Sequence, residues 1–212
     1  MKNLNIALAK GRVADQAIQL LMDCGCQFDD YSKDSRKLIF SDKKNNIKVT
    51  LVKSPDVPVY VEKGAADAGI VGKDILLEEK ADVYELVNLN IGKCHMCVAG
   101  FADKKPDYSK KITVATKYPN ITKDHFHKLG VLTDIIKLNG SVELAPLIGL
   151  SDIIVDIVES GKTLEENGLV VHEKFLPISA RLISNKVSLK TKNEEIQWVI
   201  RSLASLADQE GS

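Results

Sequence analysis

The sequence lacks an excess of charge of either sign, because 29 Lys and Arg side chains balance 29 Asp and Glu side chains. It also lacks any run approaching the ~20 apolar residues of a membrane-spanning helix, and the apolar stretch in its first residues, MKNLNIALAKGR, is too short for a signal peptide. These absences argue against a protein that coats nucleic acid or a membrane surface. We expect a cytoplasmic protein in which any anion site is a local cluster.

Arginine and cysteine are both scarce. Only four of the 29 basic residues are arginine: Arg12, Arg36, Arg181 and Arg201. Arginine binds phosphate with two parallel hydrogen bonds, so these positions carry more information than the lysines. The cysteines form a CxC and a CxxC pair: Cys24, Cys26, Cys94 and Cys97. Four thiolates could bind zinc, but both pairs lie in apolar segments where free cysteine acts as a small core residue, and we expect no metal site.

The hydrophobic pattern predicts strands and helices that alternate along the chain. A strand at residues 3–9 precedes a helix that ends near Gly25, two strands at 38–40 and 47–53 flank a polar loop, and a buried strand follows at 68–71. Strands and helices then alternate as far as a last helix over residues 194–209. This order predicts an α/β fold with a mainly parallel sheet in each of two lobes, and ligands at the carboxyl ends of the strands.

The segment DIIVDIVESGKTL, residues 152–164, combines an apolar strand with a loop of acidic and hydroxyl side chains at the start of a helix. It is not an ATP-binding P-loop, because Asp156 stands where that motif requires glycine. Acids suit a sugar phosphate, with Asp156 or Glu159 accepting hydrogen bonds from ribose hydroxyls. The next four residues would hold the phosphate: Ser160, Gly161, Lys162 and Thr163. The alternative is an ordinary helix N-cap at Ser160 or Thr163.

Three other segments carry candidate ligand groups. ALAKGR brings Lys10 and Arg12 through a glycine turn, where they could bind a diphosphate or simply be solvated. DAGIVGKD, residues 67–74, places an acid on each side of a glycine-containing strand. It suits an adenine or ribose lying close to the backbone, or a buried strand with capping acids. Glu143 either lines a cleft or ends a strand.

Five segments occur in an order and spacing that resemble one family: ALAKGR, DVPVYVEKGAADAGIVGKDIL, ATKYPNIT, GSVELAPLIGLSDIIVDIVESGKTLEENGL and RLISN. Over nearly its whole length the chain is similar to the ATP phosphoribosyltransferases. The resemblance implies a bilobed fold like that of type II periplasmic-binding proteins, with a cleft between a lobe of residues 1–92 plus 179–212 and a second lobe of residues 93–178. It also implies the transfer of 5-phosphoribosyl from 5-phosphoribosyl diphosphate (PRPP) to N1 of ATP, the first step of histidine biosynthesis. Mg²⁺ would be held mainly by the substrate diphosphate.

The resemblance further implies which residues bind the substrates. The PRPP loop would run from Asp156 to Leu164, with Lys10, Arg12 and Arg36 facing the diphosphate or ATP. Six residues would form the nucleotide side: Asp67, Gly69, Gly72, Asp74, Glu143 and Ala145. Two positions depart from the family pattern, because Ala9 replaces a common proline and Lys53 stands where many relatives have arginine. A lysine at position 53 would contact the diphosphate without a bidentate pair.

The resemblance is to the short form of the family, because too few residues follow RLISN for a regulatory domain. It implies a homodimer within a hetero-oligomer, together with a regulatory subunit resembling histidyl-tRNA synthetase. The last helix has an apolar face that lobe one or this subunit would bury: Ile196, Val199, Ile200, Leu203 and Leu206. The alternative function is a cytoplasmic module that binds a small anion or nucleotide without chemistry, which would release no diphosphate.

Overall fold

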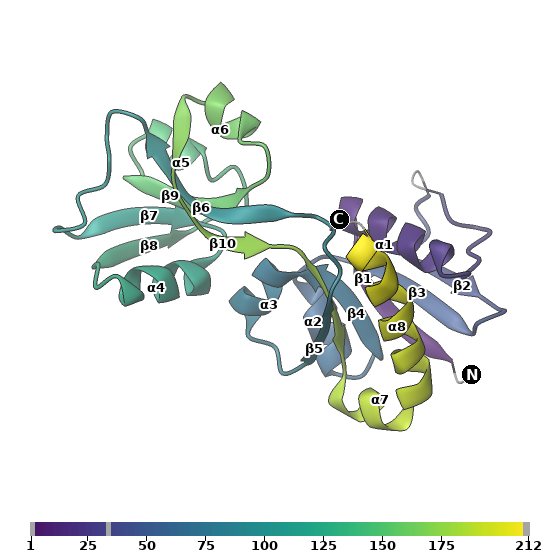
Figure 1. Ribbon diagram of the computed structural model, residues 1–212. Helices are drawn as coiled ribbons and strands as arrows, with labels where there is room; N and C mark the ends of the chain where they lie inside the picture. Colours follow the sequence, from purple (N-terminus) through teal and green to yellow (C-terminus); the bar gives the residue numbers. More distant parts are fainter. Residues whose placement is uncertain (1–2, 33–34, 210–212) are drawn as a thin grey trace. The chain divides into compact units, whose positions relative to one another are not determined.

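The computed structural model describes residues 3–32 and 35–209, the last four of them by backbone alone. The chain divides into two compact units, unit 1 (Met1–Gly92 and Ser179–Ser212) and unit 2 (Lys93–Ile178). Figure 1 shows that each unit consists of a β-sheet with helices packed against it. Within the described ranges, no helix is both long and apolar enough to cross a membrane.

Unit 1 contains a six-stranded sheet in the order β2-β3-β1-β4-β11-β5. Its strands are β1 (Leu4–Ala9), β2 (Ile39–Asp42), β3 (Ile47–Val52), β4 (Ala68–Gly72), β5 (Tyr84–Asn88) and β11 (Ala180–Ser184). Its helices are α1 (Arg12–Asp23), α2 (Asp56–Glu62), α3 (Lys73–Glu79), α7 (Lys186–Thr191) and α8 (Asn193–Gln209). Strand β1 lies parallel to β3 and β4, whereas β2 forms the expected hairpin with β3.

Helices α1 and α8 cover part of this sheet through their apolar faces. The residues of α1 that are buried, Ala14, Ala17, Ile18 and Leu21 among them, recur every three or four positions, as an amphipathic helix requires. From α8, Ile196, Val199 and Leu203 enter the same core. These three residues of the last helix are therefore buried in unit 1, the lobe expected to cover them. The side chain of Leu206 lies outside the described residues.

Helix α2 was not expected from the sequence, because Pro55 and Pro58 break up the apolar pattern. Pro55 is the N-cap residue and Pro58 lies in the first turn, where a helix does not need the missing N–H. The helix packs on β4 at Gly69, since a Cβ there would lie 2.9 Å from both Val57 and Val61. Gly69 thus allows a helix, rather than a ligand, to approach the strand.

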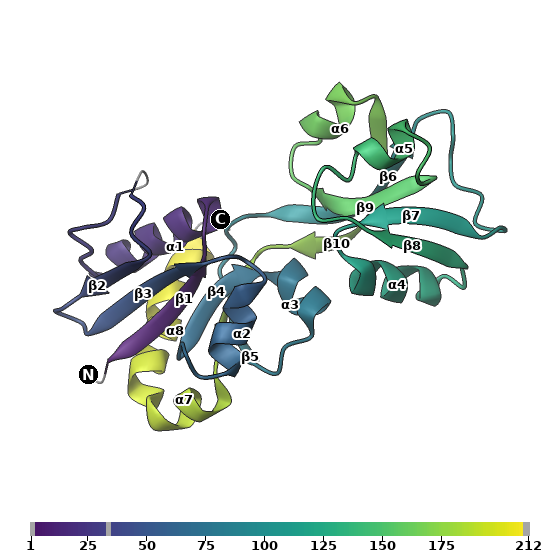
Figure 2. The ribbon, with the colours of Figure 1, turned by 180° about the vertical axis from the view of Figure 1, so that it is seen from behind.

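Unit 2 contains a five-stranded sheet in the order β10-β6-β9-β7-β8. Its strands are β6 (Cys94–Phe101), β7 (Ile112–Thr116), β8 (Thr133–Lys137), β9 (Ile153–Val158) and β10 (Leu169–Ile178). Its helices are α4 (Pro119–Lys128), α5 (Leu144–Leu147) and α6 (Lys162–Glu166). Figures 1 and 2 show α4 on one side of the sheet and α5 and α6 on the other.

The two sheets are mixed, so the expectation of mainly parallel sheets was wrong. In unit 2, β7 is parallel to β8 and β9, but β6 is antiparallel to both β9 and β10. In unit 1, β11 returns antiparallel to both β4 and β5. These antiparallel pairs join strands that are distant in the sequence, so the local alternation of strands and helices does not predict their sense. The parallel strands still gather their carboxyl ends at one edge of each sheet: β1, β3 and β4 in unit 1, and β7, β8 and β9 in unit 2.

Candidate active site

Four basic side chains gather at the carboxyl edge of unit 1. Ala9 pairs with Val52 at the ends of β1 and β3, and the Lys10 backbone N–H donates to the Val52 carbonyl oxygen at 2.8 Å. Lys10 and Lys53, which follow these strands directly, are therefore neighbours in the sheet. Gly11, at φ 113°, then turns the chain into α1, which begins at Arg12. All three basic side chains are exposed.

Arg36 reaches the same edge by a different route. Strand β2 runs antiparallel to β3, so its start lies beside the end of β3, and the Leu51 N–H donates to the Leu38 carbonyl oxygen at 2.8 Å. Arg36 lies two residues before Leu38 and is exposed. The topology thus brings two lysines and two arginines, distant in sequence, to one edge of a sheet. Such a cluster can bind an oligophosphate.

The end of β4 contributes a turn rather than an exposed acid. Gly72 is the N-cap residue of α3, and the Asp74 carboxylate lies so close over it that a Cβ at position 72 would overlap the carboxylate. Asp74 is itself buried. A ligand at this turn would therefore meet backbone N–H groups of the helix start.

Asp67 lies at the opposite, amino end of β4 and has a structural role. Its carboxylate accepts hydrogen bonds from the Asn5 N–H at 2.9 Å, the Ser188 hydroxyl at 2.7 Å and the Lys192 ammonium at 2.7 Å. The side chain is buried and both oxygens are bonded within the protein. We therefore correct the expectation that Asp67 contacts the nucleotide. It joins β1 and β4 to α7 and to Lys192, the residue just after α7.

In unit 2, β9 carries the acidic and hydroxyl residues to the carboxyl edge. Asp156 is half-buried on β9, where its Oδ1 accepts from the Ile157 N–H at 2.8 Å. Glu159, Ser160, Lys162 and Thr163 follow and are exposed.

The turn into α6 depends on glycine. Gly161, at φ 82°, is the N-cap residue of α6, a conformation that residues with a Cβ rarely adopt. The cap is thus neither Ser160 nor Thr163, and the Ser160 oxygen accepts only a long 3.5 Å contact from the Lys162 N–H. The hydroxyls remain at the surface beside the first N–H groups of the helix, which have no partner within it. This arrangement suits a phosphate.

Two implied site residues belong to the core of unit 2 instead. Leu164 and Ala145 are 7% and 1% exposed and pack in one apolar cluster under α5 and α6. Their side chains anchor the two helices, so a ligand can meet only the backbone of these two residues. Glu143, the residue before α5, is half-exposed and keeps a side chain that a ligand can reach.

The carboxyl edge of the unit 2 sheet also carries Lys117, which the sequence reasoning missed. Thr116 ends β7 and pairs with Val155 of β9, one residue before Asp156. Lys117 follows with its side chain exposed, and α4 begins two residues later at Pro119. The strand, lysine, Pro-initiated helix pattern was visible in ATKYPNIT, but only the pairing of β7 with β9 places Lys117 near the acidic loop.

The four cysteines are buried or partly buried. No group of three or more His, Cys, Asp or Glu side chains that could hold a metal is found among the described residues. All four cysteines are free thiols. Burial raises the pKa of the Cys97 thiol, and the neighbouring Asp156 carboxylate raises it further, while Lys174 lowers it. The raised pKa keeps the Cys97 thiol mostly protonated, and thus weakly nucleophilic, at neutral pH.

Comparison with known proteins assigns this architecture to a family. Residues 53–205 match the family model described as HisG: ATP phosphoribosyltransferase. The chain is 53% identical over 208 residues to an ATP phosphoribosyltransferase of Thermoanaerobacter sp. (strain X514), covering 98% of each chain. It is 54% identical over 203 residues to one from Caldanaerobacter subterraneus subsp. tengcongensis, covering 96% of this chain and 97% of the relative.

The solved structures that resemble the chain include the following two. One is the "ATP phosphoribosyl transferase (HisG:HisZ) complex from Thermotoga maritima", with TM-score 0.83, 33% identity and coverage of 97% of this chain and 99% of that chain. The other is the alkanesulfonate-binding protein SsuA from Xanthomonas axonopodis pv. citri, with TM-score 0.57 and 14% identity over 95% of this chain and 71% of that chain. The second likeness concerns the fold alone, and confirms the periplasmic-binding-protein-like architecture.

Proposed function

The chain belongs to the ATP phosphoribosyltransferase family, and from this we propose how its two sheet edges bind the substrates of the first step of histidine biosynthesis. The reaction joins the 5-phosphoribosyl group of PRPP to N1 of ATP and releases diphosphate. The observation that carries the proposal lies at the end of β9, where half-buried Asp156, exposed Glu159 and exposed hydroxyls precede or begin a helix capped by Gly161.

In the proposed PRPP site, this loop binds the ribose 5-phosphate. The backbone N–H groups at the start of α6 and the hydroxyls of Ser160 and Thr163 donate to the phosphate oxygens, and Lys162 supplies positive charge. Asp156 and Glu159 accept hydrogen bonds from the ribose hydroxyls. Lys117, which follows the strand paired with β9, would contribute a further cation to the phosphates.

The diphosphate and the triphosphate of ATP are proposed to meet the basic edge of unit 1. Lys10, Arg12, Arg36 and Lys53 are all exposed there. Each charge-assisted hydrogen bond to a phosphate oxygen contributes about 1.5–3 kcal/mol. On the nucleotide side we retain the backbone of the turn from Gly72 to Asp74 and the side chain of Glu143.

The chemistry needs positioning and charge stabilisation more than a general base. N1 of adenine carries no proton to remove, so it attacks the anomeric carbon directly as the bond to diphosphate breaks. The sugar acquires cationic character in the transition state, which acidic groups such as Asp156 stabilise, while the lysines and arginines stabilise the departing diphosphate. Aligning the two substrates supplies much of the rest of the acceleration.

Magnesium fits this scheme as a companion of the substrate. The described side chains form no cluster able to hold a metal by themselves, and Mg²⁺ usually keeps several waters and binds through substrate phosphates with one or two carboxylates. Asp156 and Glu159 are the carboxylates placed to serve it. Bound there, Mg²⁺ would neutralise charge on the leaving diphosphate.

We also propose that the chain pairs with a regulatory subunit resembling histidyl-tRNA synthetase, as a homodimer within a hetero-oligomer. The similar Thermotoga maritima structure is by its description a HisG:HisZ complex. The chain covers 98% of the length of the Thermoanaerobacter relative. Ile196, Val199 and Leu203 of the last helix do not supply the docking face, because unit 1 buries them.

A diphosphate-release assay tests the proposal. Purified chain, ATP, PRPP and Mg²⁺ should give diphosphate and N1-(5-phosphoribosyl)-ATP, slowly alone and faster with the regulatory subunit, which should also confer inhibition by histidine. Full activity and strong histidine inhibition of the chain alone would contradict the pairing but leave the reaction intact. Absence of product with both subunits present would contradict the substrate assignment.

A further inference from the structure

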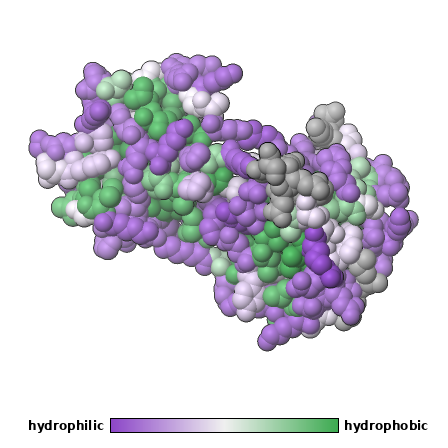
Figure 3. All heavy atoms as spheres, viewed as in Figure 1, coloured by the Kyte–Doolittle hydropathy of each residue, from purple (hydrophilic) through white to green (hydrophobic). Residues whose placement is uncertain are grey.

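Four large apolar side chains lie exposed around α5 in unit 2. Leu144, Leu147, Ile148 and Leu150 are 50%, 39%, 73% and 43% exposed. In Figure 3, hydrophobic residues reach the surface of unit 2 in the region of α5 and the end of β6. Between them, Ala145 and Pro146 are buried and hold α5 against the sheet. A contiguous apolar cluster on a well-anchored element is typical of a protein interface.

A cavity of about 400 Å³ adjoins this cluster and shares Pro146, Gly149 and Leu150 with it. Ile112 and Asp152 place the cavity at the amino ends of β7 and β9. It therefore lies at the edge of the sheet opposite the loop proposed to bind PRPP. The Ser151 hydroxyl is buried in its wall and has no hydrogen-bond partner among the residues that the structure describes.

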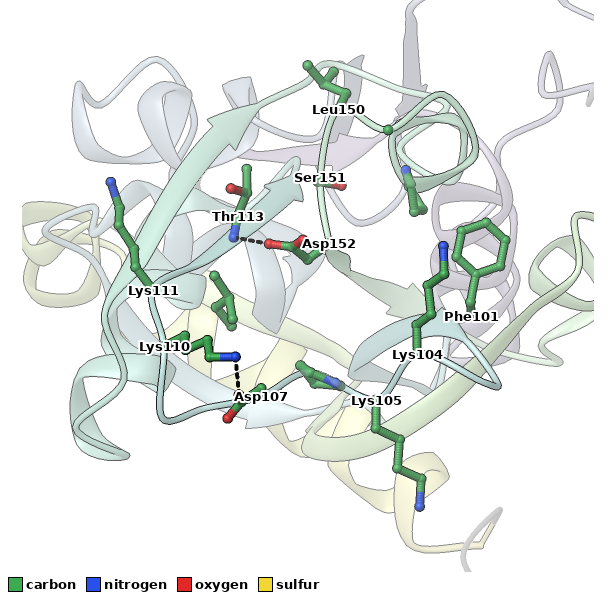
Figure 4. A pocket seen from close by; sticks show the side chains of 14 residues that line it. Phe101, Lys104, Lys105, Asp107, Lys110, Lys111, Thr113, Leu150, Ser151 and Asp152 are labelled. Carbon is green, nitrogen blue, oxygen red and sulfur yellow. Dashed lines mark hydrogen bonds and ion pairs between the residues drawn. The ribbon is translucent and has the colours of Figure 1, made fainter.

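The other wall of the cavity is basic. Four lysines and two aspartates line it: Lys104, Lys105, Lys110, Lys111, Asp107 and Asp152. Asp107 pairs with Lys110 at 3.2 Å, and Asp152 accepts a hydrogen bond from the Thr113 N–H at 2.7 Å. Figure 4 shows both interactions, with Leu150 at the rim.

Lys104 and Lys105 remain without an ion-pair partner within the described part of the chain. The Lys104 ammonium lies 5.3 Å from the centre of the Phe101 ring, so it stands beside an apolar surface rather than a carboxylate. Positive charge is thus in excess on the basic wall of the cavity, whose lining also includes Pro146, Gly149 and Leu150 beside the apolar cluster. We call the cluster and the cavity together the α5 surface.

We propose that the α5 surface binds a segment of the regulatory subunit that carries apolar side chains flanked by acidic ones. The inference rests on the proposed pairing with such a subunit. Apolar side chains of the segment would cover Ile148 and its neighbours, and its carboxylates would pair with Lys104 and Lys105. The complementarity of charge would set the register and speed the encounter.

The charge distribution favours this occupant over a second copy of the chain. A symmetric contact places the same patch of both copies face to face. Centred on the α5 surface, it would bring the unpaired lysines of one copy toward those of the other, and like charges across an interface are unfavourable. An acidic partner removes that conflict.

The test measures the affinity of the full-length chain for the purified regulatory subunit by surface plasmon resonance. Ile148→Asp and Lys104→Glu should each weaken binding by 10-fold or more. The matched controls are Val187→Asp, 67% exposed on α7 of unit 1, and Lys123→Glu, exposed on α4. Both controls should stay within twofold of wild type. Calorimetric PRPP binding by every variant reports that the substrate site and the fold are retained.

The outcomes separate the surface from the pairing. Unchanged affinity in Ile148→Asp and Lys104→Glu, with wild type binding normally, would overturn the α5 surface and leave the pairing in place. No binding by wild-type chain that still binds PRPP would overturn the pairing and the inference with it. Conversion of a homodimer into monomers by Ile148→Asp in sedimentation experiments would assign the surface to self-association and overturn the proposal.

Discussion

Replacing Asp67 by alanine should destabilise unit 1 without touching the substrate site. Asp67 is 6% exposed, and its carboxylate bonds to the Asn5 N–H, the Ser188 hydroxyl and the Lys192 ammonium. Removing the carboxylate leaves the buried Asn5 N–H without a hydrogen-bond acceptor, which lowers the free energy of unfolding by about 1–3 kcal/mol. It also breaks an ion pair, for which a fully buried case costs about 3–5 kcal/mol.

The ion-pair figure must be reduced here, because the Lys192 side chain is 25% exposed and keeps a 2.7 Å bond to the Asn3 carbonyl oxygen. The Ser188 hydroxyl can also rotate to another acceptor. We therefore expect a loss of about 3 kcal/mol in the free energy of unfolding for Asp67→Ala, and about half of that for Asp67→Asn, which keeps one acceptor oxygen.

Differential scanning calorimetry should resolve this as a fall of roughly 6–12 °C in the transition of unit 1. The control is Asp29→Ala, an exposed acid of the same unit, which should stay within about 0.5 kcal/mol of wild type. An Asp67→Ala variant with unchanged stability and lost ATP affinity would refute the structural role and restore the nucleotide contact inferred from the sequence.

Three further predictions concern single side chains. Asp156→Asn and Thr163→Ala should each raise the KM for PRPP or lower kcat by 10-fold or more with little change in melting temperature, and normal kinetics in both would remove the loop from the site. Arg12→Ala should lower kcat/KM by about 10-fold, the loss of one charge-assisted contact of about 1.5 kcal/mol, whereas a wild-type rate would make Arg12 a solvated turn residue. Burial, reinforced by Asp42, raises the pKa of Cys26 to about 12, so Cys26 should resist a thiol reagent at pH 8 until the chain is unfolded, and rapid labelling of the native protein would contradict its burial.

The elements with a strong apolar period could be predicted from the sequence. The first strand, α1, the hairpin of β2 and β3, and α8 appear where the pattern placed them. Helix α2 did not, because a proline tolerated in a first turn looks like a helix breaker in the sequence. The parallel or antiparallel sense of neighbouring strands also escaped prediction, since it depends on which distant strands become neighbours.

The local sequence pattern does not reveal which acids of the candidate site bind a ligand. An acid beside a buried strand is either a ligand or a cap, and Asp67 and Asp156 have similar sequence surroundings. Their position on the strand distinguishes them: Asp67 precedes β4 at the amino end, whereas Asp156 lies near the carboxyl end of β9, where ligands collect. Gly69 was correctly seen as a close-approach position, but only the packing of α2 identifies what approaches.

Strand β9 connects the α5 surface to the proposed PRPP loop. Asp152, in the cavity wall, precedes it directly, and Glu159 follows it, so its six residues span about 20 Å between the two edges. Hydrogen bonds to β6 and β7 on either side hold the strand rigid. A partner that repositions the start of β9 should therefore move the acids at its end, and we expect the regulatory subunit and PRPP to change each other's affinity.

That coupling is measurable and reciprocal. A coupling of the usual size, about 1–3 kcal/mol, corresponds to a change of roughly 5- to 150-fold in either dissociation constant. The dissociation constant of the wild-type chain for the regulatory subunit, measured with and without saturating PRPP, should differ by such a factor. At a subunit concentration that just saturates wild type, the Ile148→Asp variant, with its weakened docking, should show a smaller effect of the subunit on PRPP affinity than wild type does. If PRPP leaves the dissociation constant of the wild-type chain for the regulatory subunit unchanged, β9 does not couple the two sites. The partner would then have to affect the reaction by a route that bypasses the ribose-binding loop.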